Sequence, residues 1–293
     1  MPSAIPAPRA SGYTTSTPVP LYWVRYGPTG RPPLLVLHGG PGAHHDYLLP
    51  QMLALAASHE VVLYDQRGGG RSRTDDPTPI GWVQQVDDLA LVVQELGCMP
   101  LTLVGYSWGA LLAMLYTAEA AQRGLTVPQR LVLIDPAPVS RSHRARFEEE
   151  FARRQSGDRV RALRDELAAS GLRERDPDAY KQRAFELSVA GYFADPRRAT
   201  DLTPFRVTGR VQQSIWESLG DFDLLPRLQA LNLPTLLVHG WHDPIPVDSS
   251  IEAARAMRAR LVVLESSGHV PYVEQPGALF ATIEQFLQDT EGG

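Results

Sequence analysis

The sequence predicts an α/β protein with a mostly parallel, eight-stranded sheet, flanking helices and an inserted α-helical cap. Short apolar runs alternate with helical segments along most of the chain, which is typical of a parallel sheet covered by helices on both faces. The alternation stops between about residues 140 and 228, where charged residues follow a helical pattern without a strand-like run. A glycine-flanked serine, Ser107, stands at a sharp junction between one strand and the next helix.

Two groups of apolar runs account for the eight strands. Residues 13–17 and 21–26 are expected to form an opening antiparallel hairpin. The other six runs have the length of buried strands and are separated by helical segments. They lie at 34–37, 61–64, 101–104, 131–134, 235–238 and 261–264.

The same pattern divides the chain into three parts. Residues 1–12 are rich in proline, alanine and serine and are expected to be a flexible lead-in rather than a signal peptide. Residues 13–138 and 230–293 form the predicted α/β domain. Residues 139–229 are too many for an ordinary loop, and we expect them to form a helical cap over the active site.

The composition narrows the class of protein. The chain has 293 residues, 43% of them hydrophobic, which is enough for one α/β domain with an insertion. A formal charge of −5 and apolar runs no longer than a strand argue against nucleic-acid binding and against a membrane span. Cys98 is the single cysteine, so no intrachain disulfide forms and we expect a cytoplasmic protein. Nothing in the sequence indicates an oligomeric state.

Residues 105–109, Gly-Tyr-Ser-Trp-Gly, are typical of a nucleophilic serine. An apolar strand precedes this pentapeptide, and a helix of small and apolar residues follows it from Ala110 to Ala121. Such a turn holds the serine in a strained backbone and projects its hydroxyl from the carboxyl edge of the sheet. The flanking glycines avoid collisions with the neighbouring strand and helix. The context therefore predicts Ser107 as the nucleophile.

A serine needs a base and an orienting acid, and both follow later in the chain. Asp243 comes directly after one predicted strand, and His269 comes after the next. A helix over residues 247–258 separates the two, which leaves the acid and the base at the same edge of the sheet as Ser107. The order serine, acid, histidine is the one this architecture uses. We therefore predict Ser107, Asp243 and His269 as catalytic residues.

A glycine-rich loop supplies the third requirement, donors for a developing oxyanion. Residues 38–42, His-Gly-Gly-Pro-Gly, follow a strand. The expected donors are the backbone N–H groups of Gly40 and Trp108, and Gly39 is expected to contact the substrate. The group His44, His45 and Asp46 resembles a metal cluster, but adjacent histidines do not easily share one ion. We expect no metal and no organic cofactor.

Three motifs resemble the α/β-hydrolase superfamily and, within it, the proline iminopeptidase-like serine peptidases. They are residues 38–42, residues 65–72 (Asp-Gln-Arg-Gly-Gly-Gly-Arg-Ser) and residues 267–272 (Ser-Gly-His-Val-Pro-Tyr). The likeness covers most of 20–135 and 230–290. It implies the α/β-hydrolase fold, the same three catalytic residues and oxyanion donors, and an aminopeptidase that releases N-terminal residues.

One departure from this family concerns the substrate. The resemblance implies cap glutamates that hold the free amine, one of them shortly before an Asp-aromatic-Asp segment, which is residues 221–223 here. Aligning back from that segment places Gln212 or Gln213 at the position of the acid. A neutral amide supplies no charge to pair with an ammonium group. A carboxylesterase or amidase for small hydrophobic acyl groups is therefore the alternative, and a non-catalytic ligand-binding protein of this fold is the second alternative.

The substrate pocket is expected to combine elbow and cap residues. The indole of Trp108 is predicted to form one wall of the acyl pocket, because it adjoins the nucleophile. Tyr192 and Trp216 are predicted from the cap because they lie near its return to the sheet, and Gln212 joins them. The expected partner is a small molecule or a short peptide.

Overall fold

The computed structural model describes residues 5–290 and confirms the predicted fold class. Its sheet has eight strands in the order β1-β2-β4-β3-β5-β6-β7-β8. The strands are β1 (Ala10–Tyr13), β2 (Tyr22–Tyr26), β3 (Pro33–Leu37), β4 (Glu60–Tyr64), β5 (Thr102–Tyr106), β6 (Arg130–Ile134), β7 (Thr235–Gly240) and β8 (Arg260–Leu264). β1 pairs antiparallel with β2 and β2 with β4, whereas the other pairs are parallel.

The N-terminal hairpin begins earlier than predicted. Its first strand is Ala10–Tyr13 rather than residues 13–17, because the Thr14 N–H already bonds to the Leu21 carbonyl at 2.9 Å and begins the turn. Part of the predicted lead-in, residues 10–12, therefore belongs to the sheet. Residues 1–4 of that lead-in lie outside the described residues.

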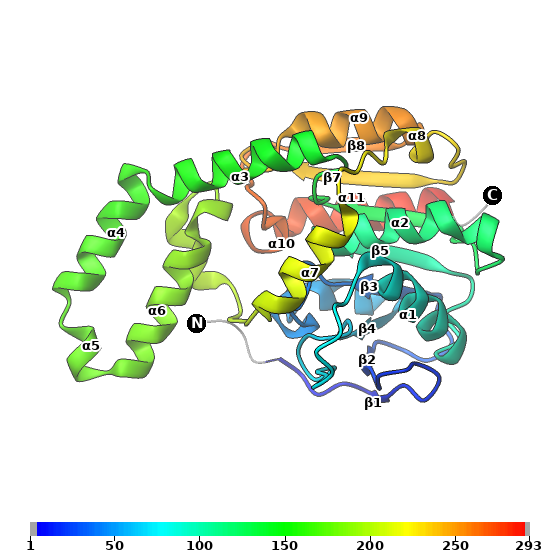
Figure 1. The fold of residues 1–293 in the computed structure, drawn as a ribbon, viewed down its shortest axis with the longest axis horizontal. Coiled ribbons are helices and arrows are strands. Elements are labelled where there is room, and N and C mark those ends of the chain that lie inside the picture. Colours follow the sequence, from blue (N-terminus) through cyan, green and yellow to red (C-terminus); the bar gives the residue numbers. More distant parts are fainter. Residues whose placement is uncertain (1–4, 291–293) are drawn as a thin grey trace.

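Helices cover both faces of the sheet (Figure 1). The domain helices are α1 (Trp82–Glu95), α2 (Trp108–Arg123), α8 (Leu225–Leu228), α9 (Val247–Met257), α10 (Pro271–Glu274) and α11 (Pro276–Thr290), with 3₁₀ turns η1 (His45–Leu48) and η2 (Gln51–Ala57). Successive strand residues face opposite layers. Leu35 and Leu37 of β3 pack with α1, α2 and α9, whereas Leu34 and Val36 pack with η2 and α11. The alternation places one apolar core on each side of the sheet.

The predicted cap is an insertion between β6 and β7. Its elements are α3 (Arg141–Gln155), α4 (Asp158–Ala169), α5 (Leu172–Arg175), α6 (Pro177–Val189), η3 (Ala190–Tyr192), η4 (Pro196–Asp201) and α7 (Gly209–Leu219). Helices α4, α5 and α6 extend away from the sheet (Figure 1). An isolated bridge between Ser140 and Asp223 joins the two ends of the insertion. Because α8 packs on α9, the cap ends nearer to residue 224 than to the predicted 229.

None of the helices in residues 5–290 combines the length and the hydropathy that crossing a lipid bilayer requires.

Candidate active site

Ser107 lies at the turn between β5 and α2 in a strained backbone conformation. Its φ is 53° and its ψ is −118°, a region that residues with a side chain rarely adopt. A Cβ on Gly105 would lie 2.6 Å from the Ala110 nitrogen, and a Cβ on Gly109 would lie 2.1 Å from the Leu37 carbonyl oxygen. Both positions therefore require glycine, and the resulting turn directs the serine hydroxyl to the carboxyl edge of the sheet.

The structure brings the three predicted catalytic residues together from three separate segments. His269 Nε2 lies 2.9 Å from Ser107 Oγ, and His269 Nδ1 lies 2.7 Å from Asp243 Oδ2. The second Asp243 oxygen accepts the Ile245 N–H at 2.7 Å. Since a carboxylate accepts, Nδ1 carries the ring hydrogen and Nε2 is free to accept the serine proton. Burial lowers the pKa of His269 to about 4, which keeps the ring neutral at neutral pH.

The loop that carries His269 is bonded to the cap. The His269 N–H donates to the Tyr192 carbonyl at 2.7 Å. The Glu274 carboxylate accepts the N–H groups of Gly268 and Ala194, at 2.7 and 2.9 Å. The position of the imidazole therefore depends on cap residues 190–194 as well as on the sheet.

The predicted oxyanion donors adjoin Ser107 and are braced by one side chain. Gly40 lines the pocket with a φ of 53°, and the Trp108 N–H is the first of α2, where N–H groups lack intrahelical acceptors. The Gln66 amide donates to the His38 carbonyl at 2.8 Å and accepts the Trp108 indole N–H at 2.8 Å. Gln66 therefore ties the glycine-rich loop to the start of α2.

A pocket of about 290 Å³ opens beside Ser107. Tyr192 and Gln212, both predicted to contact the substrate, line it. Much of the remaining lining is aromatic or aliphatic and includes Tyr47, Phe185, Phe193, Leu202, Phe205 and Val207. Among the described residues, no carboxylate side chain lines this pocket. The cavity thus offers apolar surface with a few neutral polar groups.

The predicted pocket role of Trp108 and Trp216 is wrong. Trp108 is only 1% exposed, its indole is bonded to Gln66, and its ring packs on Trp216 with the centroids 5.6 Å apart. Trp216 lies under the guanidinium of Arg144 and borders a different hollow. Trp108 is the first residue of α2, so its backbone N–H lies at the Ser107 turn. Its side chain points away from the pocket and packs against Trp216 of the cap.

Gly39, which was also predicted to contact the substrate, does not line this pocket. The Gly39 N–H already donates to the Tyr47 hydroxyl at 2.7 Å. A Cβ at this position would lie 2.8 Å from the Cβ of Ser107. Gly39 therefore allows the loop to pass closely behind the serine, and it is Gly40 that reaches the pocket.

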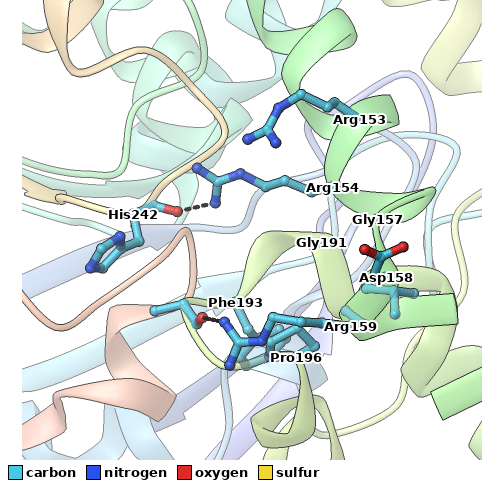
Figure 2. A pocket seen from close by; sticks show the side chains of 12 residues that line it. Arg153, Arg154, Gly157, Asp158, Arg159, Gly191, Phe193, Pro196 and His242 are labelled. Atoms are coloured by element: carbon cyan, nitrogen blue, oxygen red, sulfur yellow. Dashed lines mark hydrogen bonds between the residues drawn. The ribbon is translucent and has the colours of Figure 1, made fainter. Parts of the chain in front are cut away.

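A second hollow, of about 420 Å³, is lined in part by Gly191 and Phe193 of the cap (Figure 2). Arg153, Arg154 and Arg159 line it, and the Arg154 guanidinium donates to the carbonyl oxygens of His242 and Asp243. The hollow contains no predicted site residue. Among its lining residues, Arg154 holds the backbone of the turn that carries Asp243.

Sequence reasoning missed three polar residues around the site, of which Asp135 lies beside the predicted acid. Asp135 directly follows β6, is fully buried, and accepts the Gly240 N–H at 2.7 Å. An acid directly after a buried strand is the signal that could have found it. Gln66 lies within the motif of residues 65–72 and Glu274 lies just after that of residues 267–272, but their partners His38 and Ala194 are distant in sequence.

Comparisons with known proteins agree with the geometry. A family model described as alpha/beta hydrolase family matches residues 34–283. The proline iminopeptidase of Saccharolobus solfataricus is 26% identical over 272 residues, which cover 87% of this chain and 84% of that protein.

Two solved structures share the fold. A proline iminopeptidase from Mycobacterium smegmatis has a TM-score of 0.70 at 22% identity, with 96% of this chain and 98% of that chain covered. An enol-lactonase from Burkholderia xenovorans LB400 has a TM-score of 0.66 at 20% identity, with 94% and 100% covered. The chain therefore belongs to the alpha/beta hydrolase family and is similar to the proline iminopeptidases within it.

Proposed function

We propose that this protein is a serine hydrolase that cleaves an ester or amide bond through an acyl-enzyme at Ser107. The observation that carries the proposal is the continuous hydrogen-bonded chain from Ser107 Oγ through the His269 ring to the Asp243 carboxylate. His269 Nε2 takes the hydroxyl proton as the oxygen attacks the substrate carbonyl carbon. Asp243 holds the ring in the required tautomer and stabilises the imidazolium that forms.

The two backbone donors act on the tetrahedral intermediate. The N–H groups of Gly40 and Trp108 bind the oxyanion, and loss of one such donor typically lowers kcat by about 10²–10³-fold. His269 then gives its proton to the leaving alcohol or amine as the carbon–oxygen or carbon–nitrogen bond breaks. A water molecule, deprotonated by the same ring, attacks the ester and releases Ser107.

The pocket lining favours an uncharged, apolar acyl group. Aromatic and aliphatic side chains surround the space beside Ser107, and Gln212 supplies a neutral amide where the family resemblance implies an acid. Moving an ammonium group into such a site without a carboxylate costs several kcal/mol. We therefore favour a carboxylesterase or amidase that acts on small hydrophobic acyl groups.

A second candidate function is release of an N-terminal proline. The sequence relatives named proline iminopeptidases favour it, and the ring of proline is itself apolar. In this case the neutral acceptors of the pocket, chiefly the Gln212 side-chain oxygen, would bind the substrate amine.

Steady-state kinetics with p-nitrophenyl butyrate and proline p-nitroanilide separates the two candidates. We expect a higher kcat/KM for the butyrate ester, after correction for the reactivity of each leaving group in buffer. A higher corrected kcat/KM for the proline anilide would contradict the esterase assignment and support the aminopeptidase. The matched control is Ser107→Ala, which should remove turnover of both substrates while the folded state is retained.

A further inference from the structure

Asp135 occupies an unusual position for a carboxyl group. It follows β6 with a φ of 39°, a conformation that aspartate and asparagine tolerate better than most residues but that still costs free energy. Its side chain is fully buried, Oδ1 accepts the Gly240 N–H, and no N–H or O–H group of the described residues donates to Oδ2. An unpartnered buried carboxylate oxygen is costly, so its protonation state needs an explanation.

The Asp135 carboxyl faces the predicted triad acid. One oxygen each of Asp135 and Asp243 and one ring nitrogen of His239 all lie within 4.8 Å of one another. The His239 ring lies 3.9 Å from both carboxyls. Two carboxyl groups thus share a site on the carboxyl edge of the sheet, directly behind the histidine that contacts Ser107.

His239 does not neutralise this pair. Its Nε2 lies 3.1 Å from the Ile245 carbonyl oxygen, which can only accept, so Nε2 carries the ring hydrogen. Its Nδ1 accepts from the Ser250 hydroxyl at 2.9 Å. Burial lowers the pKa of His239 to about 4, so the ring is neutral at neutral pH. The ring atoms of His239 are also already engaged, which leaves the cluster poorly suited to a metal ion.

Other elements around the pair add little positive charge. His269 and Glu274 approach from the segment at α10, and Arg154 approaches from α3 but binds the carbonyl oxygens of His242 and Asp243 rather than the carboxylates. Burial raises the pKa of the neighbouring hydroxyl groups, which are those of Tyr106, Tyr192 and Tyr272. Two negative charges this close in a buried site are strongly unfavourable, so one carboxyl keeps its proton.

The hydrogen bonds indicate which carboxyl is protonated. Asp243 accepts the Ile245 N–H on one oxygen and His269 Nδ1–H on the other, whereas Asp135 accepts only the Gly240 N–H. Burial and then the facing Asp243 carboxylate raise the pKa of Asp135 well above its usual value. Burial also raises the pKa of Asp243, but the Asp135 carboxyl and the Ile245 N–H lower it. The proton therefore belongs on Asp135 Oδ2.

We propose that Asp135 is a positioning residue whose protonated carboxyl donates to Asp243, so that the single negative charge of the pair stays on the carboxylate that holds His269. The proposal rests on the triad function proposed above. A neutral donor draws charge from Asp243, which weakens its hold on the imidazolium proton. Asp135 thereby sets both the orientation of the acid and the basicity of His269.

The test compares two substitutions that both suit the backbone of Asp135. Asparagine and glycine each tolerate a φ of 39°, but only Asp135→Asn keeps an acceptor for Gly240 and a donor for Asp243. We expect Asp135→Gly to lower kcat/KM for p-nitrophenyl butyrate by about tenfold or more, the typical result of losing a hydrogen bond to a charged group. We expect Asp135→Asn to restore kcat/KM to within about threefold of the wild type.

The pH profile of kcat/KM provides the readout that a purely structural role would not move. Without the donor, Asp243 becomes more basic and raises the pKa of His269, so the acidic limb of Asp135→Gly should shift to higher pH. The limb of Asp135→Asn should coincide with that of the wild type. If Asp135 carried a charge, both substitutions would remove it and shift the limb to lower pH, which would overturn the proposal. Equal impairment by both substitutions, or no change in either, would overturn it as well.

Two controls keep this test separate from the proposed function. Asp221→Asn changes an exposed aspartate and should leave both the rate and the pH profile unchanged. Labelling of Ser107 by a fluorophosphonate probe tests the hydrolase assignment on its own, because a wild-type protein that is not labelled contradicts that assignment. A labelled wild type with coincident profiles for all variants contradicts only the role of Asp135. Urea unfolding midpoints establish that each variant is folded.

Discussion

The rim of the sheet and the outer cap are built in different ways. At the rim, Ser107 is set by a strained turn between two glycines, and the His269 ring and the Asp243 carboxylate are buried and hydrogen-bonded. In the outer cap, charged side chains pair with neighbours on the same helix, such as Lys181 with Asp178, and both partners are largely exposed. The rim has little freedom to change without losing its geometry, whereas the outer cap can vary in sequence.

The inner surface of the cap joins these two regions. Tyr192 accepts the His269 N–H through its carbonyl and also lines the pocket beside Ser107. The Arg154 guanidinium fixes the backbone of the turn at Asp243 (Figure 2). The cap segments near the sheet therefore help to position the triad, and we propose that the pocket between them and the sheet selects the substrate.

The largest expected effect is at the rim. Asp243→Asn should lower kcat for p-nitrophenyl butyrate by about 10³–10⁴-fold, because an amide no longer holds His269 in the productive tautomer. Asp248→Asn is the matched control, since Asp248 is an exposed neighbour paired with Arg146, and it should retain nearly full activity. Comparable losses of kcat in both variants would contradict the role of Asp243 as the acid that orients His269.

Acid should destabilise the protein through buried rim histidines. Burial lowers the pKa of His38 and of His239 from the usual 6.5 to about 4. Below about pH 6.5 the unfolded chain binds protons that the folded protein does not, so the stability present above that pH is lost as pH falls toward 4. Each such proton changes the unfolding free energy by about 1.4 kcal/mol per pH unit.

Urea unfolding at about pH 7 and about pH 5 measures this effect. We expect a clearly lower unfolding free energy at the lower pH, with contributions from both histidines. A free energy that stays constant or rises between these pH values would contradict the neutral, buried state of the two rings.

A substitution at the inner surface of the cap should change the preference between two substrates more than it changes kcat. Gln212→Glu adds a carboxylate to the pocket lining, so the ratio of kcat/KM for proline p-nitroanilide to that for p-nitrophenyl butyrate should rise by about tenfold. Gln213→Glu is the matched control, because Gln213 does not line this pocket and bonds to Glu217 instead. An unchanged ratio in Gln212→Glu, or an equal change in the control, would contradict the placement of residue 212 in the substrate pocket.

The smallest effect is expected in the outer cap. Lys181→Met removes an exposed pair with Asp178, and such pairs contribute about 0–1 kcal/mol. The thermal midpoint and the kinetics should stay close to those of the wild type. A large loss of activity would show that the outer cap is coupled to the rim more tightly than its contacts indicate.

The strands of the sheet and the three triad residues could be predicted from the sequence, because each is marked by a local sequence pattern. A buried strand is a short apolar run, and glycine spacing marks the turn at Ser107. Side-chain directions were less accessible: Trp108 adjoins the nucleophile in sequence, yet its indole packs against Trp216, away from the pocket. The role of Asp135 depends on contacts with Gly240 and Asp243, which only the folded sheet brings near.

Mass spectrometry of an acid-quenched reaction detects the proposed acyl-enzyme at Ser107. The protein is mixed with p-nitrophenyl butyrate, quenched within the first turnovers and digested. We expect a butyryl group on the peptide that contains Ser107, and no such adduct in Ser107→Ala. Rapid release of p-nitrophenol with the acyl group on another residue, or an adduct that persists in Ser107→Ala, would contradict the proposed acyl-enzyme.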